Sequence, residues 1–170
     1  MPVYTIDDRR SSVVVSARSN VHDTRAVWSR VTGTVEADPD DLAGGGAAVD
    51  LAVDMTRHDA GDFLRNRKLR KDLEVDRHPE ARFRLSSLSQ VAATGPGRFT
   101  ARAEGVIAWR GREVPMAATG EGELSRDELA ATARFELDVR AFGVEPPRFL
   151  MFKVEEIVAV EVTLVARAAG

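Results

Sequence analysis

Residues Ala133-Arg134-Phe135-Glu136-Leu137-Asp138-Val139-Arg140-Ala141 alternate without exception between apolar and charged side chains. Successive side chains of a β-strand point to opposite faces, so this stretch predicts a strand with one apolar and one solvated face. The same alternation returns near the C-terminus, at Val158, Val160, Val162, Leu164 and Ala166. We expect both segments to cover an apolar interior on one side only.

Six other segments show the same period or are rich in β-forming residues: 13–18, 28–38, 49–55, 81–91, 98–110 and 113–124. Turn-forming sequences such as Gly95-Pro96-Gly97 lie between them, and short connections favour antiparallel neighbours. An open sheet of about eight such strands would leave two edges exposed. The sequence therefore predicts an all-β fold, a closed antiparallel up-and-down β-barrel of about eight strands.

Two segments interrupt the strand pattern. Residues 59–73 are charged, lack β-branched residues and contain good helix formers, which predicts one short helix between strands. Residues 142–152 contain Pro146-Pro147, so we expect an apolar connection with room for one helical turn. Its run Phe149-Leu150-Met151-Phe152 is expected to plug the barrel mouth or to form a dimer contact. A plain cover over one end of the core is the alternative.

Length and composition narrow the class of protein. A chain of 170 residues fits one domain, which we take as 1–170. The formal net charge is −3 and both signs are interspersed, which argues against a nucleic-acid partner. The absence of cysteine excludes disulfides and thiolate metal sites. The histidines stand far apart in sequence, so no metal site is predicted.

Targeting and membrane segments are not evident in the sequence. Residues 1–7 have neither a basic start nor an apolar run, from which we expect a cytoplasmic protein. No stretch approaches the ~20 apolar residues that a membrane-spanning helix needs.

Small residues recur on the faces predicted to point inward. The strand that places Phe99, Ile107 and Trp109 inside also carries Ala101, Ala103 and Gly105 on that face. On the same parity, the next strand carries Val114, Met116, Ala118, Gly120 and Gly122. If these gaps align, side chains do not fill the barrel and a lumen remains. The alternative is that Gly and Ala permit strong coiling of the sheet or close approach of the helix, with no cavity.

The wall of such a lumen offers few polar groups, so we expect an apolar ligand. Each buried methylene contributes ~0.8 kcal/mol, and a few isoprene units could outweigh an association cost of ~4–15 kcal/mol. The candidate ligand-binding residues are Val53, Met55, Phe83, Leu85, Phe99, Ile107, Trp109, Met116, Phe135, Leu137, Val160 and Val162.

Several short motifs, in their order along the chain, resemble the YceI-like family. Val31-Thr32-Gly33-Thr34-Val35 is similar to an early Gly-containing strand of that family, and Phe142-Gly143-Val144 to a late Phe-Gly signature. His78 stands where the family commonly has Tyr. The resemblance implies a lipocalin-like barrel that takes up amphipathic polyisoprenoid molecules, quinones or their precursors among them, and often forms dimers. It implies no settled catalytic activity.

His22 and His58 are the candidate rim residues. We expect both at strand ends, where they cap loops or touch the polar head of a ligand. Each is followed by an aspartate, but adjacent strand residues point to opposite faces, so no catalytic role is assigned. The basic run 65–71 either attracts anionic head groups at a membrane surface or forms a solvated helix face.

Together these observations predict a cytoplasmic protein that forms a homodimer and carries or stores an isoprenoid-type lipid without a cofactor. One alternative is an enzyme that acts on a lipid or small aromatic molecule in the same lumen, using a histidine and a carboxylate at the rim. The other is a structural dimer with a solid core.

Overall fold

The computed structural model describes residues 2–18, 24–44, 46–144 and 156–169, and the backbone of 148–149 and 152–153. Its helices are α1 (Phe63–Asp72) and the 3-10 helix η1 (Val139–Phe142). The strands are β1 (Val3–Ile6), β2 (Ser12–Ala17), β3 (Thr24–Trp28), β4 (Val31–Glu36), β5 (Ala48–Asp54), β6 (His58–Asp59), β7 (Glu80–Gly95), β8 (Arg98–Trp109), β9 (Arg112–Leu124), β10 (Glu128–Asp138), β11 (Arg148–Phe149), β12 (Phe152–Lys153) and β13 (Ile157–Ala168).

One antiparallel sheet wraps into a closed barrel. Its strand order is β1-β4-β5-β7-β8-β9-β10-β13-β2-β3-β6, and an additional pairing of β1 with β13 closes it. β13 pairs with β2 along one part of its length and with β1 along another, so β1 and β2 act as two halves of one bent strand. β3 and β4 are related in the same way. The predicted closed barrel of eight antiparallel strands with one short helix is confirmed.

The bend between β1 and β2 is closed by a side chain. Ser11 lies in this bend and is buried. Its hydroxyl donates to the carbonyl of Val165 (3.3 Å) and accepts from the amide of the same residue (3.0 Å). The carbonyl of Val165 also accepts from the amide of Asp7 (2.8 Å), so the hydroxyl supplies the partner of the buried amide and a second donor to the carbonyl.

The second bend corrects a prediction. A single strand over residues 28–38 was wrong, because the chain turns at Ser29 and Arg30 and separates β3 from β4. The amide of Ser29 donates to the carbonyl of Arg57 (3.4 Å), and the carbonyl of Arg30 accepts from the amide of Asp54 (3.1 Å). Tertiary hydrogen bonds therefore set the break.

Two element ends also differ from prediction. The strand predicted over 133–141 ends at Asp138, whose carboxylate accepts from the amide of Arg140 (3.0 Å) and caps η1. The one helical turn therefore lies just before the predicted connection. The helix predicted over 59–73 begins only at Phe63, because the Asp62 carboxylate accepts from the amide of Arg65 (2.8 Å). Short strand β1 was not predicted.

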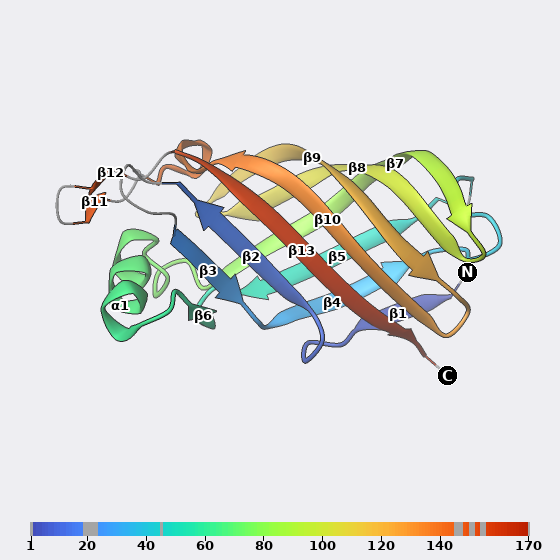
Figure 1. Ribbon diagram of the computed structural model, residues 1–170, viewed down its shortest axis with the longest axis horizontal. Coiled ribbons are helices and arrows are strands. Elements are labelled where there is room, and N and C mark those ends of the chain that lie inside the picture. Colours follow the sequence, from blue (N-terminus) through green and yellow to red (C-terminus); the bar gives the residue numbers. More distant parts are fainter. Residues whose placement is uncertain are drawn as a thin grey trace.

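The buried core is divided between the two ends of the barrel. Figure 1 shows α1 at one end, here called the helix end, and both chain termini at the other, the terminal end. One buried cluster includes Tyr4, Leu124 and Leu129 and closes the terminal end. The other includes Trp109 and Phe142 and lies at the helix end.

Candidate ligand-binding cavity

A cavity of about 660 Å³ occupies the barrel between the two buried clusters. Strands β2 to β5, β7 to β10 and β13 all contribute side chains to its wall. Leu124 and Leu129 line it at the terminal end, and Trp109 lines it at the helix end. Most lining residues are apolar, as the one-sided strand pattern predicted. The polar or charged ones are Thr24, Arg25, Arg65, Lys68, Asp72, Arg82, Glu121 and Thr132.

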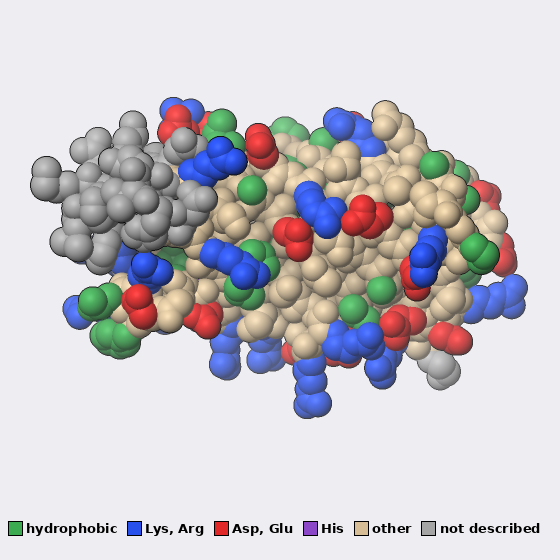
Figure 2. Space-filling view, viewed as in Figure 1, with side chains coloured by type: hydrophobic (Ala, Val, Ile, Leu, Met, Phe, Trp, Pro, Cys, Tyr) green, Lys and Arg blue, Asp and Glu red, His purple; other side chains and the backbone are tan. Residues whose placement is uncertain are grey.

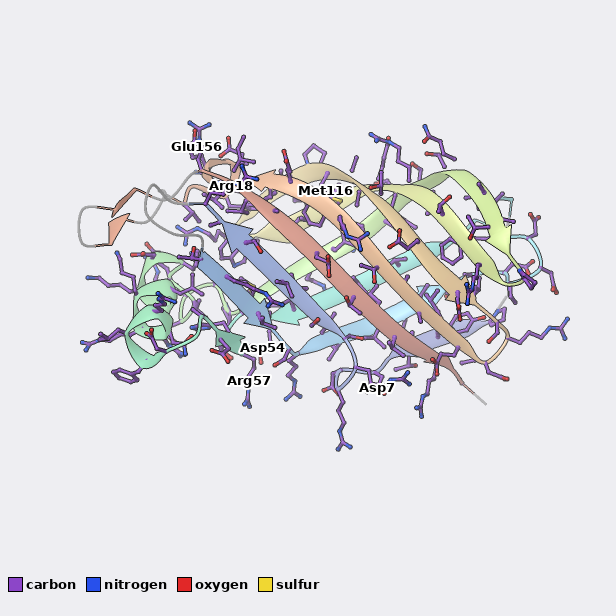
Figure 3. The ribbon with its side chains drawn as sticks, in the orientation of Figure 1. Asp7, Arg18, Asp54, Arg57, Met116 and Glu156 are labelled. Carbon is purple, nitrogen blue, oxygen red and sulfur yellow. The ribbon has the colours of Figure 1, made fainter. Side chains whose placement is uncertain are left out.

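Every candidate ligand-binding residue predicted from the sequence lines this cavity. They come from β5, the turn after it, β7 to β10 and β13, and Met116 is marked on β9 in Figure 3. Phe83, Phe99 and Phe135 face inward yet are only partly buried. That combination is expected where a side chain borders an unfilled space. Their contact with a ligand stays a prediction.

Small residues line up across neighbouring strands, as the sequence suggested. Ala101 on β8 pairs with Gly120 on β9, which in turn pairs with Ala133 on β10. All three line the cavity. At this level of the barrel, three adjacent strands present no side chain larger than a methyl group, so the space between the walls stays open.

Gly105 and Gly122 fit the alternative explanation, in which glycine permits close approach of neighbouring strands and leaves no cavity. Gly105 and Gly122 were also predicted to leave gaps, but neither lines the cavity. A Cβ added at Gly105 would lie 2.5 Å from the carbonyl oxygen of Arg84 and against the ring of Phe83. These glycines permit close approach within the coiled sheet, while Ala101, Gly120 and Ala133 border the lumen.

Polar side chains reach the cavity at the helix end. Arg65, Lys68 and Asp72 of α1 line it there, together with Thr24 and Arg25 at the start of β3. The Lys68 ammonium donates to Asp72 Oδ1 (2.9 Å). Asp72 Oδ2 is shielded from solvent and has no hydrogen-bond partner in the described part of the chain. We call Lys68 and Asp72 the mouth pair.

Sequence reasoning did not single out the mouth pair. The i,i+4 spacing of Lys68 and Asp72 was the available signal, because such residues are neighbours on a helix. Their place beside the lumen depends on how α1 docks, which local sequence does not encode.

Hydrogen bonds from the side chain of Arg110 to two backbone carbonyls hold the helix end together. Arg110 Nη1 donates to the carbonyl of Leu73, just after α1 (2.7 Å), and its Nε donates to the carbonyl of Phe142 in η1 (3.0 Å). Val75 follows the helix and is fully buried in the cluster at this end. The C-terminal end of α1 is thereby fixed against the barrel.

Of the two predicted rim histidines, the structure tests only His58. His22 lies outside the described residues. His58 does not line the cavity, and its ring nitrogens lie 3.2 Å from the carbonyl oxygens of Met55 and Asn66. This placement favours the capping role over contact with a ligand. The side chains of the apolar run 149–152 also lie outside the described residues.

Asp54, the last residue of β5, does not line the cavity, and its carboxylate accepts hydrogen bonds from the turn that follows. The hydroxyl and the amide of Thr56 both donate to its Oδ1, at 2.6 and 3.0 Å. These hydrogen bonds, the hydroxyl first, lower the pKa of Asp54, and the nearby charges of Arg57 and Arg30 act in the same direction. Figure 3 shows Asp54 and Arg57 beside each other near β6. The group therefore acts as a structural acceptor at the turn after β5.

The described ranges contain neither a metal-binding cluster nor a membrane-spanning helix. Within them, no group of three or more His, Asp or Glu side chains could hold a metal ion. No helix in the same ranges is both long enough and apolar enough to span a bilayer.

The geometry defines a class of protein, a closed antiparallel β-barrel with an apolar internal cavity and a polar mouth beside a helix. A family model described as the YceI-like domain matches residues 4–166. The chain therefore belongs to the YceI-like family.

Solved structures with the same fold have low sequence identity to this chain. Burkholderia cenocepacia BcnA is 18% identical with a TM-score of 0.76, over 94% of this chain and 98% of that chain. A polyisoprenoid binding domain from Saccharophagus degradans, implicated in plant cell wall breakdown, is 13% identical with a TM-score of 0.76, over 99% and 100%. The Campylobacter jejuni YCEI protein is 10% identical with a TM-score of 0.64, over 85% of each chain. A search of curated protein sequences found no significant match.

Proposed function

We propose that this protein carries or stores an amphipathic isoprenoid-type lipid, a polyisoprenoid, quinone or quinone precursor, inside its barrel. The observation that carries the proposal is the apolar cavity of about 660 Å³ between two buried clusters. Its volume falls in the range of about 300–1,000 Å³ typical of small-molecule sites. The description of the Saccharophagus degradans domain as polyisoprenoid-binding supports the same class of ligand.

The energetics of the cavity support an occupant. In cores with small engineered cavities, stability falls by about 24 cal/mol for each Å³ of void. Atoms that line an unfilled space lack contacts on one side, so a filled lumen is more stable than an empty one. Water is a poor filler, because each buried molecule needs two to four polar partners. A chain of apolar carbons restores the missing contacts.

Burial alone gives enough binding energy for a long ligand. At ~0.8 kcal/mol for each buried methylene, an isoprene unit contributes roughly 3–4 kcal/mol. A few units then offset the ~4–15 kcal/mol cost of association. Affinity therefore rises with chain length until the cavity is full, and binding requires no chemical step.

Solvent extraction of the purified protein followed by mass spectrometry tests the proposal. We expect an unmodified isoprenoid-type lipid in near-stoichiometric amount. Recovery of no lipid, together with failure to take up added isoprenoid lipids, would support the structural dimer instead. Recovery of a chemically altered lipid after incubation with a known one would support the enzymatic alternative, which no contact in the described residues favours.

Helix α1 is the proposed contact with a membrane surface. Its first two residues, Phe63 and Leu64, are 76% and 62% exposed, although both are large and apolar. The helix carries five basic residues and one acidic residue, and Figure 2 shows hydrophobic and basic side chains together at this end of the molecule. Apolar anchors next to basic side chains suit an anionic lipid surface.

Ion pairs limit how much of that charge faces a membrane. Arg65, Lys68 and Arg70 pair with Asp62, Asp72 and Asp76. Within the described residues, Arg67 and Lys71 form no ion pair. The contact we propose is therefore weak and transient, with the exposed Phe63 and Leu64 contributing more than the charge.

A homodimer and a cytoplasmic location complete the proposal. The homodimer is proposed from the apolar run 149–152, and the cytoplasmic location is a separate proposal. Sedimentation of the purified protein tests the first, since a monomer at all concentrations would contradict it. Cell fractionation tests the second.

A further inference from the structure

The cavity is chemically different at its two ends. At the terminal end its wall is built from buried apolar residues such as Val35, Leu124 and Leu129. At the helix end it includes the charged mouth pair, Lys68 and Asp72. An amphipathic ligand in this cavity therefore has one favourable direction, with its chain toward the terminal end and its polar head beside α1.

One carboxylate oxygen of the mouth pair lacks a hydrogen-bond donor in the described residues. Asp72 Oδ1 accepts from Lys68, but Oδ2 is shielded from solvent and lacks a donor in the described residues. A buried carboxylate oxygen without a hydrogen bond is costly, and native proteins rarely leave one unpaired. Lys68 is partly exposed and has three N–H donors, of which Asp72 uses one.

We propose that the mouth pair is the head-group site and that it selects a lipid ending in a neutral hydroxyl, the head of a long-chain alcohol. Rotation of the Asp72 carboxylate turns Oδ2, which is shielded in this structure, toward the lumen, where it accepts the hydroxyl hydrogen while the hydroxyl oxygen accepts from Lys68. This inference rests on the proposed lipid-binding function and deepens it. One hydroxyl matches both unmet requirements, because it is a donor and an acceptor at once.

A phosphate head fits the same site poorly. A fully ionised phosphate monoester offers acceptors only, so it leaves Asp72 Oδ2 unpaired and adds two negative charges beside it. Lys68 and Arg65 would attract the phosphate, but Asp72 opposes it at short range. The carboxylate therefore acts as the selecting residue, by repelling the anion as well as by accepting from the alcohol.

Three lipids with the same chain test the assignment. The binding affinities of geranylgeraniol, its methyl ether and its monophosphate are measured with the delipidated full-length protein. The ether keeps the oxygen but cannot donate a hydrogen bond. Hydrogen bonds to a charged group are strong. We therefore expect the alcohol to bind at least about tenfold more tightly than the ether. We also expect the alcohol to bind more tightly than the phosphate.

Variants of Asp72 locate the effect. In Asp72→Ala the preference for alcohol over ether should disappear, and the phosphate should bind more tightly than to the unmodified protein. Asp72→Asn keeps the shape and one acceptor oxygen, so an intermediate preference is expected. Asp76→Ala is the matched control, because Asp76 pairs with Arg70 on the exposed surface and does not line the cavity.

The outcomes separate this inference from the proposed function. If the unmodified protein binds alcohol and ether equally, or if Asp72→Ala retains the preference, the head-group assignment is wrong although the lipid-binding function stands. If neither lipid binds, the proposed function itself fails and the assignment with it. Binding of the ether to Asp72→Ala also reports that the variant is folded.

Discussion

Ala101 on β8 lies directly opposite Gly120 on β9, and both face the interior of the barrel. Ala133 on β10 continues the row beyond Gly120. An eight-stranded barrel is just wide enough to be filled by its own side chains or to hold one small ligand. The size of the residues in this row therefore decides between a solid core and a lumen.

Filling this row should abolish lipid binding. In the double variant Ala101→Trp with Ala133→Trp, two indole rings enter the space next to Gly120. We expect lipid uptake to fall below detection, while the free energy of unfolding stays equal or rises because void is replaced by contacts. Titration with a fluorescent isoprenoid analogue and urea unfolding measure the two quantities.

Ala159→Trp supplies the control for that experiment. Ala159 lies on β13 between Val158 and Val160, but it is exposed and absent from the cavity wall. This variant should bind lipid as the unmodified protein does. Equal uptake by the double variant would show that the lipid binds elsewhere.

The ring of Phe83 covers Gly105, which predicts a large effect of a small substitution. In Gly105→Ala the added methyl group meets the Phe83 ring and lies 2.5 Å from the carbonyl oxygen of Arg84. We expect a loss of about 1–3 kcal/mol in the free energy of unfolding, as for other overpacked sites. Gly95→Ala is the control, since its nearest contact is the flexible Arg98 side chain at 3.5 Å. Similar stability of both variants would contradict the packing described here.

Tyr4 closes the terminal end of the barrel and predicts a loss of stability at high pH. Its hydroxyl donates to the carbonyl of Ser125 (2.6 Å), and burial raises its pKa, with Asp127 and Asp38 adding to the effect. The unfolded chain ionises near pH 10 and the folded chain only above it, so deprotonation favours the unfolded state. Stability from this group is full below about pH 10 and is lost as the pH rises through the folded pKa.

Tyr4→Phe isolates that contribution. The variant should lose about 1 kcal/mol at neutral pH through the missing hydrogen bond, and its stability should fall less steeply than that of the unmodified protein above about pH 10. Because Tyr4 is the only tyrosine in the chain, absorbance at high pH reports its ionisation directly. A midpoint at or below the ordinary tyrosine value would refute the burial argument.

Exposed apolar residues on α1 should control transfer of lipid from membranes. Replacing Phe63 and Leu64 by serine is expected to slow uptake from vesicles that contain anionic lipid, without changing the equilibrium affinity for lipid added in detergent. Val3→Ser is the matched variant, since Val3 is also exposed but lies at the terminal end. Unchanged transfer rates in the serine variant would argue for a solvated helix face only.

Period-two alternation made most of the cavity wall predictable. Residues such as Phe83, Phe135 and Val160 could be placed inside because strand parity carries over the whole length of a strand. The break after Trp28 could not be predicted, because apolar residues stand on both sides of Ser29-Arg30 and partners from β5 and its following turn set the bend. Asp72 was missed for a related reason, since its role depends on the docking of α1 at the barrel mouth.

The central claim is that one lipid lies inside each barrel. Native mass spectrometry after incubation with polyprenol-containing vesicles counts the lipids bound to each chain. We predict one lipid for each chain of the unmodified protein and none for the variant with tryptophan at positions 101 and 133. No bound lipid in the unmodified protein, or equal binding by both proteins, would contradict the account.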